Sequence, residues 1–377
     1  MRPLSIVMVS AGFWPAFGGA ERQALELSAA LAARGRRVTV LTRRVGGLPA
    51  RETIRGVAVR RLPSPGGVLD APVFLAAAFA WLLLHWLEWD AVHAHLAGSP
   101  ALAAAFAGRL LGRPALVKLG GGRGIGELAV SSRTRLGRAK LRVLGLLRPR
   151  FLAVVPDLAD EARAFLGPVS IEVLPNGVDT ARFRPVDREA KRALRAELGW
   201  SVDATVSLYT GRFSWEKRLP WFLKLWLEAA GANSLAVLVG DGPERAAVED
   251  VAARSSGRVQ VLPSREDVGN VLLAADVFVL PSVSEGLSNA LLEAMASGLA
   301  PLGSRVGGTA ETVVDGRDGL LFERDDEDAL KAAVRRLESE PGLTARLGAA
   351  ARAKVEERYA LDRIVARLET LYEGICI

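Results

Sequence analysis

Short apolar runs alternate with longer amphipathic runs along almost the whole chain of 377 residues. This alternation is typical of βαβ units, in which a buried parallel strand is followed by a helix that covers the sheet. In the first half, the pattern predicts strands near residues 4–10, 37–42, 57–62, 90–94, 114–119, 151–155 and 171–174. It predicts helices near residues 20–34, 73–87, 99–111, 133–147 and 157–166.

A turn-forming segment, PNGVD at residues 175–179, interrupts the alternation and predicts a domain boundary. Strands then follow near residues 204–210, 235–239, 258–262, 276–280 and 299–303. The predicted helices lie near residues 186–198, 217–230, 243–254, 288–297, 325–339, 342–358 and 361–374. A chain of this length is too long for one ordinary core.

We therefore predict an α/β protein with two Rossmann-like domains that face each other across a cleft. The N-terminal domain is expected to comprise residues 1–175, and the C-terminal domain residues 176–360. Residues 361–377 are expected to form a helix that packs back toward the N-terminal domain.

The charge is distributed unevenly between the two halves. Residues 1–175 hold 23 Lys and Arg against 11 Asp and Glu, whereas residues 176–377 hold 26 against 31. A basic N-terminal half predicts an anionic partner for it. A coding bias toward arginine is the alternative, but bias does not explain why only one half is positive.

No signal peptide is expected, because the N-terminus has neither a long apolar region nor a small-residue cleavage site, and we expect a cytoplasmic protein. The apolar run at residues 73–87 is shorter than the roughly 20 residues that a membrane span needs. We interpret it as a buried core helix. The single cysteine, Cys376, and the three histidines argue against a disulfide framework and a multi-histidine metal site.

Open parallel sheets bind ligands at the carboxyl ends of their strands, so the residues that follow strands are the candidates for a site. The predicted strand 204–210 leads into GRFSWEKR, in which Arg212 and Lys217 flank a short loop. A guanidinium fork and an ammonium at one strand end suit a diphosphate. Two solvated surface charges are the alternative interpretation.

The segment PSVSEGLSNALLEAMASG, residues 281–298, is the most informative one in the chain. It places Glu285 in a loop and Glu293 about one and a half turns into the next helix. The intervening amides of Leu287, Ser288 and Asn289 open that helix, where free N–H groups bind anions. A carboxylate among apolar neighbours, such as Glu293, needs a partner.

The first half has weaker candidates. Gly18 and Gly19 open the first predicted helix, where the backbone can approach a phosphate closely. A plain strand-to-helix turn is an equal alternative, since GFWPAFGGAE is neither GxGxxG nor a Walker A sequence. Lys118 and Arg123 flank a glycine loop that can bind an anion. His95 ends the strand WDAVHAH, where a histidine with a purely structural role is an equal alternative.

Together these motifs resemble the retaining nucleotide-sugar glycosyltransferases of family 4, which have the GT-B fold. The matching features are GG-x-E, a strand-end histidine, GR-x4-K, GDGP, E-x7-E within PS-x2-EG-x5-LEAMA-x-G, and GG-x2-E. The resemblance covers nearly the whole chain, and it implies that residues 1–175 bind the acceptor and residues 176–360 bind the donor. It departs after His95, where relatives often carry an acidic or aromatic residue, and at Lys118 to Arg123, where relatives often carry His-Gly. Both departures concern the acceptor.

The resemblance implies a hexosyltransferase that moves a sugar from a nucleoside diphosphate sugar with retention of anomeric configuration and front-face departure of the leaving group. Arg212 and Lys217 would hold the diphosphate, Glu293 the ribose, and Glu285 the transferred sugar. Gly18 and Gly19 would approach the same phosphates, and His95 would reach the sugar near its anomeric carbon. No cofactor and no metal are expected, because no Asp-x-Asp pair follows any of the strands predicted above for the donor half.

The acceptor stays open between a lipid-linked or cell-envelope glycan and a soluble natural product. No nucleic-acid partner is expected. Residues 133–150 predict a basic amphipathic helix, which either lies on an anionic membrane surface at the inner face of the membrane or is an ordinary surface helix.

Two other functions fit parts of the pattern. An NAD(P)-dependent oxidoreductase would share the Rossmann-like halves, but the GxGxxG fingerprint after the first strand is missing. A catalytically inert membrane-surface protein could keep the same fold.

Overall fold

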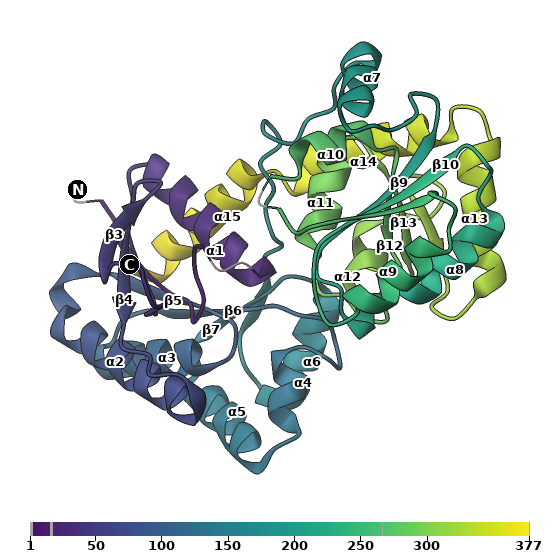
Figure 1. Ribbon diagram of the computed structural model, residues 1–377. Coiled ribbons are helices and arrows are strands. Elements are labelled where there is room, and N and C mark those ends of the chain that lie inside the picture. The colour runs from purple at the N-terminus through teal and green to yellow at the C-terminus, as the bar shows by residue number, and fades with distance from the viewer. Residues whose placement is uncertain (1–2, 16–17, 266, 377) are drawn as a thin grey trace. The chain divides into compact units, whose positions relative to one another are not determined.

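The computed structural model describes residues 3–15, 18–265 and 267–376, and these residues form two compact units. Unit 1 comprises residues 1–177 together with 361–377, and unit 2 comprises residues 178–360. Figure 1 shows a parallel sheet with helices on its faces in each unit. The boundary lies two residues after the predicted one, and the last helix belongs to unit 1.

Unit 1 is built on an eight-stranded sheet with the order β3-β4-β2-β1-β5-β6-β7-β8. Its strands are β1 (Ser5–Val9), β2 (Arg37–Arg43), β3 (Arg51–Ile54), β4 (Val57–Leu62), β5 (Ala91–His95), β6 (Ala115–Leu119), β7 (Arg150–Ala153) and β8 (Ile171–Val173). All neighbours are parallel except β3 and β4, which form a hairpin. The sequence pattern missed β3, because its turn is Arg55-Gly56, with φ of 48° and 80°, and not one of the usual Asn-Gly or Asp-Gly pairs.

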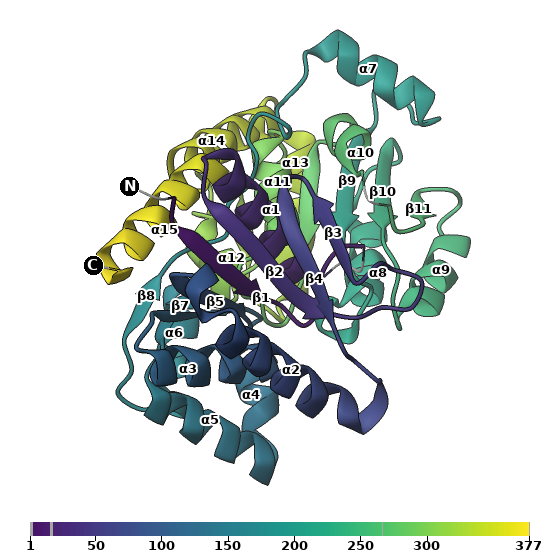
Figure 2. The same cartoon turned by 90° about the vertical axis from the view of Figure 1, so that its left-hand side faces the viewer.

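The helices of unit 1 lie on both faces of this sheet (Figures 1 and 2). They are α1 (Gly19–Ala33), α2 (Asp70–Leu84), α3 (Ser99–Leu111), α4 (Glu127–Ser132), α5 (Arg135–Leu147), α6 (Pro156–Leu166) and α15 (Leu361–Cys376). On one face, α1 and α15 pack together over a core that includes Leu27, Leu31, Leu368 and Tyr372. On the other face, α2 packs along α3, which contacts α5.

Helix α2 is not the buried core helix that the sequence predicts. Only Phe74, Ala78 and Leu82, one stripe at helical spacing, are buried. With the preceding turn it forms an apolar stretch, Gly67–Leu84, of 18 residues with a mean hydropathy of 2.0, of which 17% is buried. By length and composition alone this stretch could cross a membrane. The prediction of burial is wrong because an apolar run marks a helix without showing whether anything covers its outer side.

Unit 2 is built on a six-stranded parallel sheet with the order β11-β10-β9-β12-β13-β14. Its strands are β9 (Thr205–Thr210), β10 (Ser234–Val239), β11 (Val259–Leu262), β12 (Val277–Leu280), β13 (Ala300–Ser304) and β14 (Leu320–Phe322). Its helices are α7 (Arg188–Glu197), α8 (Leu219–Ala229), α9 (Arg245–Ala253), α10 (Gly269–Ala274), α11 (Asn289–Ala296), α12 (Gly307–Thr312), α13 (Glu327–Ser339) and α14 (Leu343–Arg358). The sequence pattern missed β14 and α10, which are too short to show a period.

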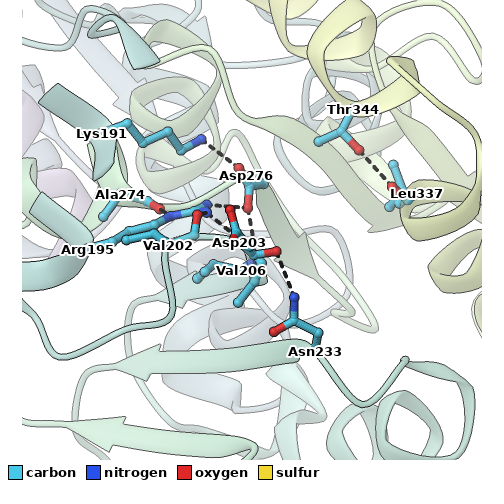
Figure 3. Close-up of polar contacts among 11 residues, drawn as sticks. Lys191, Arg195, Val202, Asp203, Val206, Asn233, Ala274, Asp276, Leu337 and Thr344 are labelled. Atoms are coloured by element: carbon cyan, nitrogen blue, oxygen red, sulfur yellow. Dashed lines mark hydrogen bonds and ion pairs between the residues drawn. The ribbon is translucent and has the colours of Figure 1, made fainter. Parts of the chain in front are cut away.

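A buried arginine attaches α7 to the sheet of unit 2 (Figure 3). Arg195 donates to the carbonyl oxygens of Ala274, Val202 and Ala204 at 2.8–2.9 Å and to Asp276 Oδ2 at 2.5 Å. Asp276 also accepts from Lys191 Nζ at 2.6 Å. Because the guanidinium is paired with a carboxylate and makes four hydrogen bonds, its burial is tolerated.

Candidate functional site

In each sheet, the chain adds strands first on one side of its first strand and then on the other side. The place where this direction changes is the topological switch point. In unit 2, β9 lies between β10 and β12, and in unit 1, β1 lies between β2 and β5. Ligands of open parallel sheets bind outside the carboxyl ends of the strands at this switch point. Arg212 and Lys217 follow β9, Glu285 follows β12, Gly18 and Gly19 follow β1, and His95 ends β5, so the topology selects these positions as the sequence motifs do. Lys118 and Arg123 belong to the next strand, β6, and to the loop after it.

At the switch point of unit 2, Lys217 and Glu285 form an ion pair. Lys217 lies in a 3-10 turn after β9, and Glu285 lies in the loop after β12. The Nζ to Oε1 distance is 2.5 Å, and the two side chains are 19% and 8% exposed. Ser282 Oγ donates to the same carboxylate oxygen at 2.6 Å. The Glu285 carboxylate is therefore fixed in a mostly buried position by one cation and one hydroxyl.

A hydrogen bond from Tyr209 fixes the backbone of the loop that carries Arg212. The phenol of Tyr209 donates to the Arg212 carbonyl oxygen at 2.9 Å. Burial and the nearby carboxylates of Glu285 and Glu216 raise the pKa of Tyr209 well above its ordinary value, so the phenol stays a proton donor. The Arg212 side chain itself is exposed, and it makes no ion pair with the residues that the structure describes. The Tyr209 bond thus fixes the backbone of Arg212, whose side chain is open to solvent.

Close backbone packing joins the loops of unit 2 around this ion pair. Val283 N–H donates to the Glu216 carbonyl oxygen at 2.8 Å, and Gly308 N–H donates to the Glu285 carbonyl oxygen at 3.1 Å. A Cβ at Gly308 would overlap the carbonyl oxygen of Gly286. Only glycine permits this approach, which explains the glycine turn that follows β13.

The residues predicted to bind the ribose and the phosphates lie in α11 and directly before it. Ser288 is the N-cap of this helix, and its Oγ accepts from Leu291 N–H at 3.3 Å. Leu287 is buried, whereas Ser288 and Asn289 are partly exposed. Glu293, one turn after Asn289, is 5% exposed. This carboxylate is buried, as expected of a polar group with a specific partner.

At the switch point of unit 1, the chain after β1 leads into α1. Gly18 and Gly19 are exposed at the start of this helix. The carboxylate of Glu21 lies against Gly12 and Gly18, where added Cβ atoms would meet it. The glycines therefore allow the glutamate to fold back onto the loop. Residues 16 and 17 of the same loop lie outside the described residues.

His95 lies at the end of β5, where it is 3% exposed and stacks on His93 with 4.8 Å between ring centroids. The Nδ1 of His93 is hydrogen-bonded to the hydroxyl of Tyr372 on α15, at 2.7 Å. Burial, together with the Lys118 charge, lowers the pKa of His95 to about 3. His95 is therefore a neutral imidazole at pH 7, able to form a hydrogen bond but not to carry a positive charge.

Lys118 lies opposite His95 in the register of β5 and β6, and its side chain is buried. Its ammonium has no hydrogen-bond partner among the described residues, and the same is true of the Nε2 atoms of His93 and His95. Burial lowers the pKa of Lys118 to about 7. A buried, unpaired cation at a strand end suits an anionic or hydroxyl-bearing ligand.

Arg123 differs from Lys118 in its surroundings. It is exposed and forms an ion pair with Asp157 at 2.5 Å. Two carboxyl groups of unit 1 accept hydrogen bonds from the backbone of the glycine loop at residues 120–124. Gly120 N–H donates to Glu127 at 2.9 Å, and Gly124 N–H donates to Glu161 at 2.8 Å. These two amides are occupied by the protein's own carboxyl groups and are not available to a ligand anion.

The sequence analysis missed three residues that shape the site: Ser282, Tyr209 and Glu127. Burial raises the pKa of Glu127 to about 7, so this carboxyl titrates close to neutral pH. Ser282 lies three residues before Glu285, and this spacing was visible in the sequence. Tyr209 and Glu127 gave no local signal, because their partners are defined by loop packing.

Within the described residues, no group of three or more His, Cys, Asp or Glu side chains is arranged to hold a metal ion. The polar groups at the unit 2 switch point are instead a cation, a carboxylate, a hydroxyl and helix-opening amides. Cations and amides of this kind stabilise a developing phosphate charge directly.

Two family models match the chain. The model described as Glycosyltransferase Family 4 matches residues 17–182, and the model described as Glycosyl transferases group 1 matches residues 204–340. Each match therefore covers most of one Rossmann-like half.

The chain is also similar to characterised proteins and solved structures over nearly its full length. It is 31% identical to the 2-deoxystreptamine N-acetyl-D-glucosaminyltransferase of Streptomyces fradiae, over 94% of this chain and 92% of that enzyme. The sucrose-phosphate synthase of Thermosynechococcus elongatus has the same fold, with a TM-score of 0.80, 22% identity and 98% of both chains covered. The Anabaena protein HepE, in its complex with UDP-glucose, gives a TM-score of 0.79 at 20% identity, covering 98% of this chain and all of that one.

Proposed function

We propose that this chain, which belongs to glycosyltransferase family 4 and has the GT-B fold, transfers a sugar from a nucleoside diphosphate sugar with retention of anomeric configuration. The observation that carries the proposal is the ion pair of Lys217 and Glu285 at the switch point of unit 2. The Anabaena structure with UDP-glucose supports a nucleotide sugar as donor.

In this mechanism, unit 2 binds the donor and stabilises the leaving diphosphate. Lys217 and Arg212 contact the phosphate oxygens, and the amides of Leu287, Ser288 and Asn289 at the start of α11 add donors. Glu293 accepts hydrogen bonds from the ribose hydroxyls. Fixed donors aimed at a charge that grows in the transition state lower the barrier more than mobile water does.

Glu285 contacts the transferred sugar and supports the positive charge that develops at its anomeric carbon. The carboxylate already accepts from Lys217 and Ser282, so it needs no reorganisation when the sugar binds. The diphosphate departs on the face where the acceptor enters and accepts the acceptor's proton. No metal and no cofactor takes part, because the two cations and the amides neutralise the diphosphate.

In unit 1, Gly18 and Gly19 let the start of α1 approach the phosphates, and neutral His95 forms a hydrogen bond to the sugar near the anomeric carbon. Lys118 and Arg123 are assigned to the acceptor side, which is a lipid-linked or cell-envelope glycan in our proposal. The oxidoreductase and the inert protein considered above are not favoured, since both family models describe glycosyltransferases.

A panel of nucleoside diphosphate sugars, with mass-spectrometric detection of hydrolysis, tests the donor without an acceptor. We expect one donor to be hydrolysed in the presence of EDTA. The sugar first released should keep the anomeric configuration of the donor, as measured by NMR before mutarotation. Hydrolysis that requires a divalent cation, or release of the opposite anomer, would contradict the mechanism.

Lys217→Ala tests the leaving-group role. We expect hydrolysis of the preferred donor to fall by about 10²–10³-fold, the effect of removing one donor from a charge-stabilising site. Lys224→Ala, at an exposed position on the following helix α8, is the matched control and should retain wild-type hydrolysis. Equal hydrolysis by the two variants would remove Lys217 from the reaction.

A further inference from the structure

The outward side of α2 is as apolar as its inward side. The inward stripe is Phe74, Ala78 and Leu82, and the outward stripe contains Ala76, Ala80 and Leu84, which are exposed. Leu84 is 80% exposed, and no charged residue lies between Asp70 and Glu88. An ordinary surface helix carries polar residues on its outer face, whereas the outer face of α2 lacks such polar side chains.

The neighbouring helices continue this apolar surface. α2 packs along α3, and Phe79 meets Phe106 of α3 edge to face at 6.4 Å. α3 in turn contacts α5, and Figures 1 and 2 both show the three helices on the same side of the unit 1 sheet. Leu110 on α3 is 66% exposed, and Leu136 and Leu146 on α5 are 83% and 80% exposed.

The same part of the chain is strongly basic. Residues 91–156 contain 11 Lys and Arg but only one acidic residue, Glu127, which is turned toward the amide of Gly120. On α5, Arg135 and Arg142 are exposed beside the leucines. We call the surface made by Leu84, Leu110, Leu136, Leu146, Arg135 and Arg142 the α2–α3–α5 face.

We propose that the α2–α3–α5 face docks on the surface of an anionic phospholipid bilayer. Leucines beside arginines suit the interface, where apolar side chains enter the acyl boundary and guanidinium groups contact lipid phosphates. A second copy of the chain is the less suitable occupant, because a two-fold contact would bring this basic face against itself. The proposal does not depend on the donor chemistry of unit 2.

The test measures binding of the full-length protein to vesicles by flotation. We expect binding to phosphatidylcholine vesicles that contain about 30 mol% phosphatidylglycerol, and little binding to pure phosphatidylcholine. Raising the salt from about 0.1 M to about 0.5 M should weaken binding, since the electrostatic attraction is screened. Equal binding to both vesicle types, or none at low salt, would overturn the proposal.

Two double variants separate the contributions of charge and apolar contact. Arg135→Gln with Arg142→Gln should lower the affinity for anionic vesicles about 25-fold, roughly fivefold for each arginine near the lipid surface. Leu84→Gln with Leu136→Gln should also lower the affinity. The matched controls are Arg188→Gln with Arg192→Gln, at exposed positions of α7 in unit 2, and Val314→Gln, and neither should change binding.

Donor hydrolysis by unit 2 should be unchanged in all of these variants, which would show that they are folded. A protein that hydrolyses the donor but does not bind vesicles would contradict the docking proposal alone, and the proposed reaction would stand. Protein that stays with the vesicles after alkaline carbonate washing would show insertion of α2 across the bilayer and overturn surface docking. A concentration-dependent dimer that the leucine variants dissociate, without vesicle binding, would assign the face to a second copy instead.

Discussion

At the residue scale, Lys118 and His95 form an unusual pair of neighbours at the ends of β5 and β6. Both side chains are buried, and Lys118 is among the causes that keep His95 neutral. Burial of an ammonium without a partner opposes folding, because the charged form loses its hydration. Such a group is retained at the expense of stability where a ligand uses it, which is the pattern expected of a functional site.

The pKa of Lys118 predicts how stability depends on pH. This pKa falls from 10.5 in the unfolded chain to about 7 in the folded protein, so the unfolded state binds more protons between these two values. The contribution of Lys118 to the free energy of unfolding therefore rises as the pH increases from about 7 to about 10.

Lys118→Met should remove this dependence. At pH 7 we expect the variant to be more stable than the wild type by roughly 1–4 kcal/mol, and the difference should shrink toward pH 10. Chemical denaturation across this pH range measures it, with Lys224→Met at an exposed position as the control. A Lys118→Met variant that is less stable at pH 7 would show that the ammonium has a partner in the folded protein.

At the element scale, α15 follows unit 2 in sequence but belongs to the core of unit 1. Its buried residues Ile364, Val365, Leu368 and Tyr372 join the cluster that includes α1. Glu369 accepts from Arg34 and Arg36 at 2.7 Å in both cases. The helix therefore supports β5, since Tyr372 also bonds to His93 beside the candidate site.

Substitution in α15 should consequently destabilise unit 1 and leave unit 2 intact. Leu368→Ala should lower the free energy of unfolding by about 2–5 kcal/mol, the usual loss on emptying a buried leucine site. Hydrogen exchange should speed up in residues 1–177 and 361–377. Leu330→Ala, at a fully buried position of α13, should speed up exchange in residues 178–360 instead. The opposite assignment of the two effects would contradict the division into units.

At the scale of the whole molecule, the two units differ in charge. Unit 1 carries 25 Lys and Arg against 14 Asp and Glu, and unit 2 carries 24 against 28. The coding bias toward arginine applies to both, so it does not account for the difference. The basic unit is the one with the α2–α3–α5 face, and in the acidic unit Lys217 is paired with a carboxylate.

If unit 2 alone provides the diphosphate site, a nucleoside diphosphate should protect that unit first. At UDP concentrations about 100 times its dissociation constant, we expect unit 2 to gain about 2.7 kcal/mol of stability. Amides of residues 178–360 that exchange only through unfolding of unit 2 should then slow by about 100-fold. Protection confined to unit 1 would place the diphosphate elsewhere and contradict the prediction.

The sequence alone determined the two Rossmann-like halves and the strand-end positions of Lys217, Glu285 and His95. It could do so because strand and helix periods and glycine turns are local properties of the chain. Tertiary structure decided that Glu285 pairs with a lysine 68 residues away, that Lys118 is buried without a described partner, and that the outer side of α2 is uncovered. Periodicity identifies the faces of an element, but their burial depends on which distant segments pack against them, and no local pattern encodes that.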